Sequence, residues 1–136
     1  MNVRRILVPL ALDAGEAPTL GVAAKLARGD AGTIFLLHIV TDSDQGPAAQ
    51  LTQELARKAL EEMARVNLDA GIPKEILVGS GDPASVIIDF ERVIPADLVV
   101  MRTHARVTRL RKALGTVTER VVRESLCPVL VVPQAI

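Results

Sequence analysis

The chain has almost no aromatic residues. Its 136 residues include two phenylalanines, Phe35 and Phe90, and neither tryptophan nor tyrosine. Base-stacking platforms need several aromatic side chains, so they cannot be built here. Lysine plus arginine and aspartate plus glutamate are balanced at 16 each, whereas nucleic-acid-binding domains usually carry a clear basic excess. Composition therefore argues against nucleic acid as a partner.

Cysteine and long apolar runs are also scarce. Cys127 is the sole cysteine, so no disulfide can form within the chain, which fits a reducing cytoplasm. No apolar run approaches the roughly 20 residues of a membrane span, and the N-terminal segment lacks the cleavage pattern of a signal peptide. We therefore expect a single cytoplasmic domain over residues 1–136, with no membrane association.

The sequence does contain five short apolar runs rich in β-branched residues. They cover residues 3–9, 33–40, 76–78, 98–101 and 129–132. Each is nearly continuous rather than alternating in polarity, which is typical of strands buried on both faces. Helical patterns lie between them, and this alternation predicts an α/β domain with a parallel sheet.

Four helices are expected between these runs. The first lies within residues 16–28, with Pro18 in its first turn and Gly29 at its end. The second, over residues 47–70, is the longest. Its apolar spacing predicts an inner face made of Leu51, Leu55, Ala59, Met63 and Val66. The third begins at Asp82-Pro83, as an N-cap followed by proline, and Thr116 with Glu119 suggests a capping box for the fourth.

The last third of the chain has the layout of an anion-binding site. The run at 98–101 leads into a loop without acidic residues, then to Gly115-Thr116 and an amphipathic helix. A glycine at a helix start lets backbone N–H groups approach a phosphate. The basic side chains of this loop either form a solvated surface or attract a phosphate or an acidic partner. They are Arg106, Arg109, Arg111 and Lys112.

Common catalytic and metal-binding patterns are missing. Neither His38 nor His104 has a cysteine or an acidic residue at a metal-ligand spacing, so no metal is expected. The G-x-S-x-G elbow of serine hydrolases does not occur. We therefore assign no catalytic residue and expect that the protein is not an enzyme.

Several segments resemble the universal stress protein family. They are RRILVPLALD at 4–13, LLHIV at 36–40, GSGDPASVII at 79–88, ADLVVMRTHAR at 96–106 and GTVTERVVRESLCPVLVVP at 115–133. The resemblance implies a Rossmann-like open parallel sheet of five strands, in the order 3-2-1-4-5, with helices on both faces. It also implies a homodimer that pairs through the last strand.

One branch of that family binds ATP through the pattern G-x2-G-x9-G-[S/T] after the fourth strand. Overlaying this pattern keeps Gly115 and Thr116 but puts Arg102 and Ala105 where the first two glycines belong. That branch also tends to carry aspartate two residues after the proline of the first strand, and here Ala11 stands there. The resemblance makes five residues candidates for a nucleotide site, namely Pro9, Met101, Gly115, Thr116 and Val117.

Arg102 leaves three interpretations open. Its side chain obstructs the pocket or goes with a remodelled loop, it grips a phosphate, or it is solvated without a role. The first interpretation leads to our main hypothesis: a non-catalytic, dimeric stress-adaptation protein with a degenerate nucleotide loop, no cofactor and an unidentified regulatory protein partner. The alternative is a regulator that binds ATP or AMP, or a slow ATPase, using the loop at 102–116.

Overall fold

The five apolar runs form one parallel sheet. The computed structural model describes residues 2–40, 47–103 and 115–133 of the chain. Its strands are β1 (Arg5–Pro9), β2 (Thr33–Val40), β3 (Lys74–Ser80), β4 (Leu98–Arg102) and β5 (Val129–Val132). All neighbouring strands pair in parallel, and their order is β3-β2-β1-β4-β5. Both the α/β class and the strand order expected from the sequence are confirmed.

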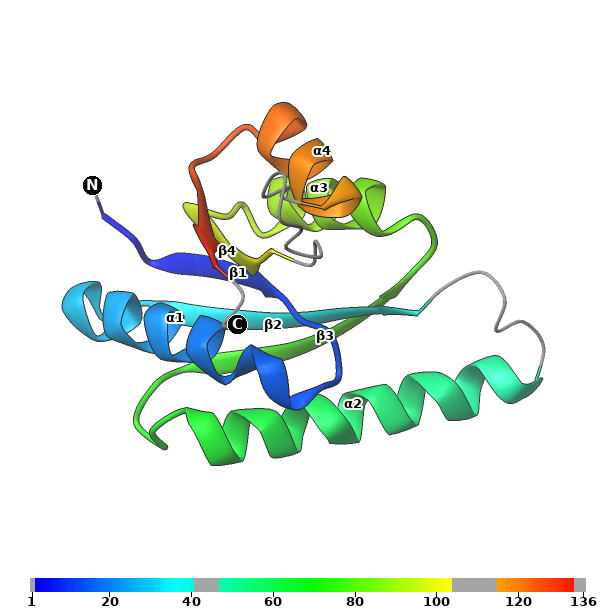
Figure 1. The fold of residues 1–136 in the computed structure, drawn as a ribbon. Coiled ribbons are helices and arrows are strands. Elements are labelled where there is room, and N and C mark those ends of the chain that lie inside the picture. Colours follow the sequence, from blue (N-terminus) through cyan, green and yellow to red (C-terminus); the bar gives the residue numbers. More distant parts are fainter. Residues whose placement is uncertain (1, 41–46, 104–114, 134–136) are drawn as a thin grey trace, which may run out of the picture.

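Helices cover both faces of this sheet (Figure 1). They are the short 3-10 helix η1 (Ala14–Glu16), α1 (Ala17–Asp30), α2 (Pro47–Asn67), α3 (Pro83–Val93) and α4 (Thr116–Glu124). Helices α1 and α2 pack on one face and α3 and α4 on the other, which divides the interior into two apolar layers. Residues along each strand alternate between these layers, so Val100 belongs to the α1 side and Met101 to the α3/α4 side.

The helix ends predicted from the sequence are confirmed in part. Asp82 caps α3, accepting a hydrogen bond from the Ser85 N–H at 3.1 Å, and Pro18 lies in the first turn of α1 as predicted. The predicted stop of α1 at Gly29 is wrong. The helix continues to Asp30 and ends at Ala31, which adopts a left-handed conformation (φ 53°) and donates its N–H to the Ala27 carbonyl.

The inner face predicted for α2 is also wrong. Leu51, Leu55 and Val66 are 59%, 58% and 65% exposed, while Ala59 and Met63 are half-buried at the border of the buried face. The residues that pack on the sheet side are Ala56, Leu60, Ala64 and Leu68. Two alanines on the inner face let α2 approach the sheet closely. The close fit of this face therefore outweighs the larger apolar area of the predicted stripe.

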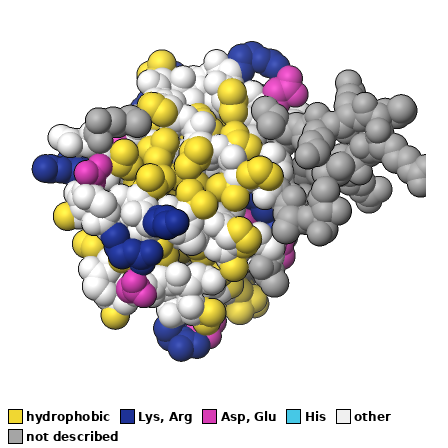
Figure 2. Space-filling view, turned by 60° about the vertical axis from the view of Figure 1, so that its left-hand side comes forward, with side chains coloured by type: hydrophobic (Ala, Val, Ile, Leu, Met, Phe, Trp, Pro, Cys, Tyr) yellow, Lys and Arg dark blue, Asp and Glu magenta, His cyan; other side chains and the backbone are white. Residues whose placement is uncertain are grey.

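Strand β5, red in Figure 1, lies at an edge of the sheet. Figure 2 turns this side of the molecule forward and shows apolar side chains gathered in the middle of the face, with charged side chains mostly near its border. Exposed apolar side chains stand in α4 (Val122, 44%), just before β5 (Leu126, 78%) and in β5 itself (Leu130, 40%). An apolar edge strand of this kind is a ready pairing surface. Among the described residues, no helix combines the length and apolarity that a membrane span requires.

Candidate functional site

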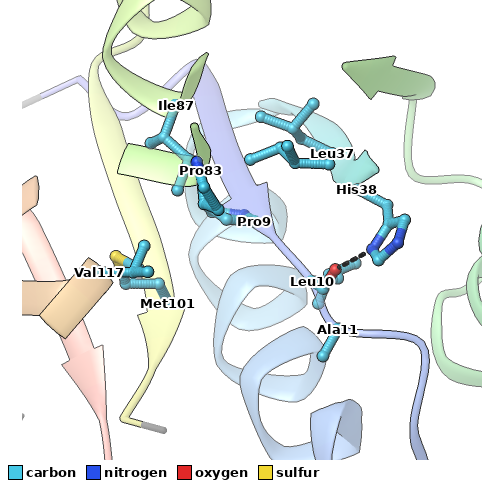
Figure 3. Close-up of a pocket in the computed structure, with 10 residues that line it drawn as sticks. Pro9, Leu10, Ala11, Leu37, His38, Pro83, Ile87, Met101 and Val117 are labelled. Carbon is cyan, nitrogen blue, oxygen red and sulfur yellow. Dashed lines mark hydrogen bonds between the residues drawn. The ribbon is translucent and has the colours of Figure 1, made fainter. Parts of the chain in front are cut away.

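A cavity of about 170 Å³ opens at the carboxyl ends of the strands, beside the point where the strand order reverses (Figure 3). Ligands of open α/β sheets bind at such a switch point. The cavity is lined by residues 9–11 after β1, residues 37–39 of β2, Pro83 and Ile87 of α3, Met101 of β4 and Val117 of α4. Its walls therefore come from three strands and from the first turns of two helices.

Three of the predicted site residues line this cavity: Pro9, Met101 and Val117. Gly115 and Thr116 begin α4 next to Val117 but are not among the lining residues. Ala11 also lines the cavity. It stands where the ATP-binding branch of the family tends to carry aspartate. Ala105 and the other loop residues discussed above, 104–114, lie outside the described residues.

Most of the wall formed by β2 and α3 was not predicted from the sequence. Leu37, Ile39, Pro83 and Ile87 line the cavity, although we had assigned them only to a strand and to a helix. The rule that ligands bind at strand carboxyl ends would have pointed to the end of β2. No comparable signal existed for α3, because its position follows from tertiary packing.

The amino end of α4 begins at a glycine. Its N-cap is Gly115, which has φ 95° and, in the structure as described, no side-chain cap hydrogen bond. The predicted capping box is wrong, because Thr116 is the first helical residue and the carboxylate of Glu119 instead accepts from Arg123 at 2.8 Å. The first N–H groups of a helix carry a partial positive charge that favours a negatively charged ligand.

Hydrogen bonds make the β1–β2 wall of the cavity rigid. The Leu10 N–H donates to the Leu37 carbonyl at 2.8 Å. The Leu10 carbonyl in turn lies 2.8 Å from Nδ1 of His38 (Figure 3). A carbonyl oxygen only accepts hydrogen bonds, so Nδ1 of His38 carries the proton that is donated in this contact.

On the opposite side of the sheet, Arg102 forms an ion cluster with Asp13 and Glu16, here called the Arg102 cluster. Its Nη1 and Nη2 donate to Oδ1 and Oδ2 of Asp13, both at 3.0 Å, and its Nε lies 3.1 Å from Oε1 of Glu16. A β-carbon on Gly15 would collide with Nη1 of Arg102, so the close approach of the guanidinium requires glycine there. Bidentate pairing of this kind is among the strongest side-chain contacts.

The placement of the Arg102 side chain excludes obstruction of the cavity, a phosphate contact inside it and a solvated side chain. The side chain is 6% exposed, so it is not solvated. It meets η1 and the β1–α1 connection, whereas the neighbouring Met101 points to the cavity. Arg102 is not among the cavity-lining residues, so it neither obstructs the cavity nor reaches into it for a phosphate. Whether the loop is remodelled concerns residues outside those described.

Glu16 links the Arg102 cluster to the cavity. Its carboxylate is fully buried, and Oε2 accepts a hydrogen bond from the Ala11 N–H at 2.7 Å. Burial raises the pKa of Glu16, while the bond from Ala11 and the charge of Arg102 oppose that rise in part. The Ala11 peptide, which lines the cavity, is thus held from behind by a buried acid.

Replacing Glu16 by glutamine should flatten the pH dependence of stability just above the ordinary glutamate pKa of 4.5. Because the folded-state pKa is raised, the native state holds the proton longer than the unfolded state. Wild-type stability therefore contains a contribution that is present below pH 4.5 and is lost as the pH rises through the folded pKa. Urea unfolding of both proteins at closely spaced pH values measures it, and a constant difference in unfolding free energy would contradict the assignment.

The fold is that of an open α/β domain with a parallel sheet, and its cavity lies beside the switch point, where ligands of such domains bind. The model of the universal stress protein family matches residues 2–133. The chain belongs to the universal stress protein family. A curated relative, universal stress protein MJ0531 of Methanocaldococcus jannaschii, is 34% identical over 84 residues. That match covers 62% of this chain and about half, 49%, of the relative.

Solved structures share the fold at lower sequence identity. Hypothetical protein MJ0577 has a TM-score of 0.81 and is 24% identical, over 100% of this chain and 99% of that one. A universal stress protein in complex with cAMP has a TM-score of 0.73 and 17% identity, covering 99% and 100%. The protein from Archaeoglobus fulgidus in complex with dAMP has a TM-score of 0.66 and 19% identity, covering 96% and 98%. These likenesses concern the fold.

Proposed function

We propose that this universal stress protein is a non-catalytic regulatory protein of the cytoplasm that binds an adenine mononucleotide in the cavity beside β1 and β4. The observation that carries the proposal is the cavity itself, which Pro9, Met101 and Val117 line and into which Arg102 does not project. This favours the nucleotide-binding alternative over the degenerate site. Two structural relatives in complex with cAMP and dAMP point to the same ligand class.

The size and surroundings of the cavity suit one ring system. Its volume of about 170 Å³ is below the roughly 300–1,000 Å³ of sites that enclose whole drug-sized ligands. A purine base fits the apolar walls, and its sugar and phosphate would then extend outside them. The uncapped start of α4, next to the lining residue Val117, offers N–H groups to the phosphate.

The same walls favour binding over turnover. Hydrolysis of a nucleotide requires a group that activates water and groups that stabilise phosphate charge, usually with a bound cation. Of the side chains that line the cavity, His38 is the one with an imidazole ring, and its Nδ1 is held by the Leu10 carbonyl. In the part of the chain that the structure describes, no three His, Cys, Asp or Glu side chains group to hold a metal.

AMP at a hundred times its dissociation constant should add about 2.7 kcal/mol to the stability of the native protein, because it binds only the folded state. Thermal unfolding with and without AMP measures this as a shift of several degrees. Val117→Phe should remove the shift by filling the cavity mouth. Val122→Phe, on the exposed side of the same helix, should retain it.

Two results would count against nucleotide binding in this cavity. One is a melting temperature unaffected by AMP, ATP and cAMP at millimolar concentration. The other is an equal ligand-induced shift in Val117→Phe and Val122→Phe, which would move the binding site elsewhere. Release of phosphate from ATP at a rate that Val117→Phe abolishes would overturn the non-catalytic part of the proposal.

We also propose that the protein acts as a homodimer joined along β5, with a further regulatory protein as its partner. The support is the apolar edge formed by β5 and the residues before it. Leu130→Lys should shift the protein to a monomer in light scattering at micromolar concentration, because it places charge in the interface. Leu55→Lys, on α2 and more exposed than Leu130 (58% against 40%), should leave the dimer intact. A wild-type monomer would contradict the proposal.

A further inference from the structure

We propose that Arg102 is a positioning and specificity-determining residue, which keeps the carboxylates of the β1–α1 segment out of ligand recognition. The site would therefore bind adenine mononucleotides with little regard to the 2′-hydroxyl of the sugar. The inference rests on the proposed function and extends it. It concerns which groups of the nucleotide the site recognises, and it follows from the geometry of the Arg102 cluster.

A carboxylate that lies beside a bound ribose is well suited to accept hydrogen bonds from its hydroxyls. In dinucleotide-binding folds an acidic side chain accepts from the 2′-hydroxyl for this reason. Here Asp13 and Glu16 are the acids that follow β1, and both are engaged within the protein. Oδ1 and Oδ2 of Asp13 each accept from Arg102 at 3.0 Å, and Oδ1 also accepts from the Gly15 N–H at 2.8 Å.

Glu16 is engaged by an ion pair and one peptide hydrogen bond, and it is inaccessible to a ligand. It is fully buried, with one oxygen 3.1 Å from Nε of Arg102 and the other 2.7 Å from the Ala11 nitrogen. The Ala11 N–H therefore points to Glu16 and does not serve as a donor to a nucleotide. Arg102 and the Ala11 peptide thus engage both acids, with Glu16 behind the cavity wall and the half-exposed Asp13 facing α2.

Arg102 also offsets negative charge behind an anion site. Asp13 and Glu16 carry two formal charges when ionised, and the guanidinium between them cancels one. A nucleotide monophosphate brings a further charge of about −1.5 to −2. Without Arg102 the uncompensated carboxylates would repel the phosphate, while an uncharged nucleoside would experience no such repulsion.

The first test compares AMP, 2′-deoxy-AMP and adenosine by isothermal titration to the wild-type protein. The dissociation constants of AMP and 2′-deoxy-AMP should agree within about threefold, because a hydrogen bond to a carboxylate would separate them by roughly tenfold or more. Asp13→Asn should change both constants by the same factor. A ribose preference above tenfold, or one that Asp13→Asn removes, overturns the inference.

The second test replaces Arg102 itself. Arg102→Met should weaken AMP roughly fivefold and adenosine less than twofold, on a Coulomb estimate for one uncompensated charge near the phosphate. Arg102→Lys should restore most of the AMP affinity. Arg123→Met removes a charge from the exposed side of α4 and should have no such effect. Equal losses for AMP and adenosine in Arg102→Met would show a packing role and overturn the charge assignment.

These outcomes separate the inference from the function on which it rests. A wild-type protein that binds neither adenosine nor AMP overturns the proposed function, and the inference with it. Binding with a strong ribose preference overturns the inference alone and leaves nucleotide binding in place. If Arg102→Met fails to fold by circular dichroism, Arg102→Lys and the Asp13→Asn comparison still decide the question.

Discussion

Truncating Leu60 to alanine should lower the free energy of unfolding by about 3 kcal/mol, within the range of about 2–5 for buried leucines. Leu60 lies on the inner face of α2 and is fully buried in the apolar layer that this helix shares with α1 and the sheet. Removing it deletes apolar contacts and leaves a cavity that the surrounding close-packed residues fill only in part. Urea unfolding should show a lower midpoint at an unchanged slope.

The matched control is Leu55→Ala on the same helix. Leu55 is 58% exposed, so its truncation should change stability by no more than about 0.5 kcal/mol, and alanine is at least as good a helix former. Larger destabilisation by Leu55→Ala than by Leu60→Ala would mean that α2 packs through the other face. The pair therefore tests the orientation of the helix directly.

That orientation shows what hydrophobic periodicity can and cannot predict. Helix α2 carries two apolar stripes, and periodicity detects both without saying which one meets the sheet. The stripe with Leu51 and Leu55 has more apolar surface, but the one with Ala56 and Leu60 has the shape that fits. The strands posed no such ambiguity, because a strand buried on both faces needs no choice of face.

The candidate site was predictable to the extent that it is local. Pro9, Met101 and Val117 were candidates through the family resemblance, and they line the cavity from strand ends and from the first turn of a helix. The partners of Arg102 were not predictable in this way, since Asp13 lies 89 residues away in sequence. One signal was available: once β1 and β4 are neighbours, acids after β1 lie next to a basic residue at the end of β4.

The second large effect concerns Glu91, a buried acid near the end of α3. Its carboxylate holds the connection between α4 and β5 through three hydrogen bonds. Oε1 accepts from the N–H groups of Leu126 and Cys127 at 2.7 and 3.0 Å. Oε2 accepts from the Ser125 hydroxyl at 2.8 Å. Glu91 is 3% exposed, so water cannot replace it without local rearrangement. The same segment carries Cys127, whose pKa burial raises to about 11.

Glu91→Ala should therefore destabilise the protein by roughly 3 kcal/mol, because two peptide donors and a hydroxyl lose the buried carboxylate that accepts from them. Glu91→Gln keeps an oxygen for both N–H groups and should cost about 1 kcal/mol. Urea unfolding measures the two losses, and amide hydrogen exchange at residues 126 and 127 should accelerate in the alanine variant alone. Equal losses in the two variants would assign the effect to the charge of Glu91 rather than to its hydrogen bonds.

The hydrogen bonds of Glu91 also bear on the proposed homodimer. The segment that Glu91 holds leads directly into β5, the strand proposed to pair in the dimer. Loosening it should weaken the dimer by lowering the order of its edge strand, since binding must then supply the ordering cost. Light scattering of Glu91→Ala under native conditions should show more monomer than Glu91→Gln. An alanine variant that is destabilised but equally dimeric would confine the role of Glu91 to the monomer fold.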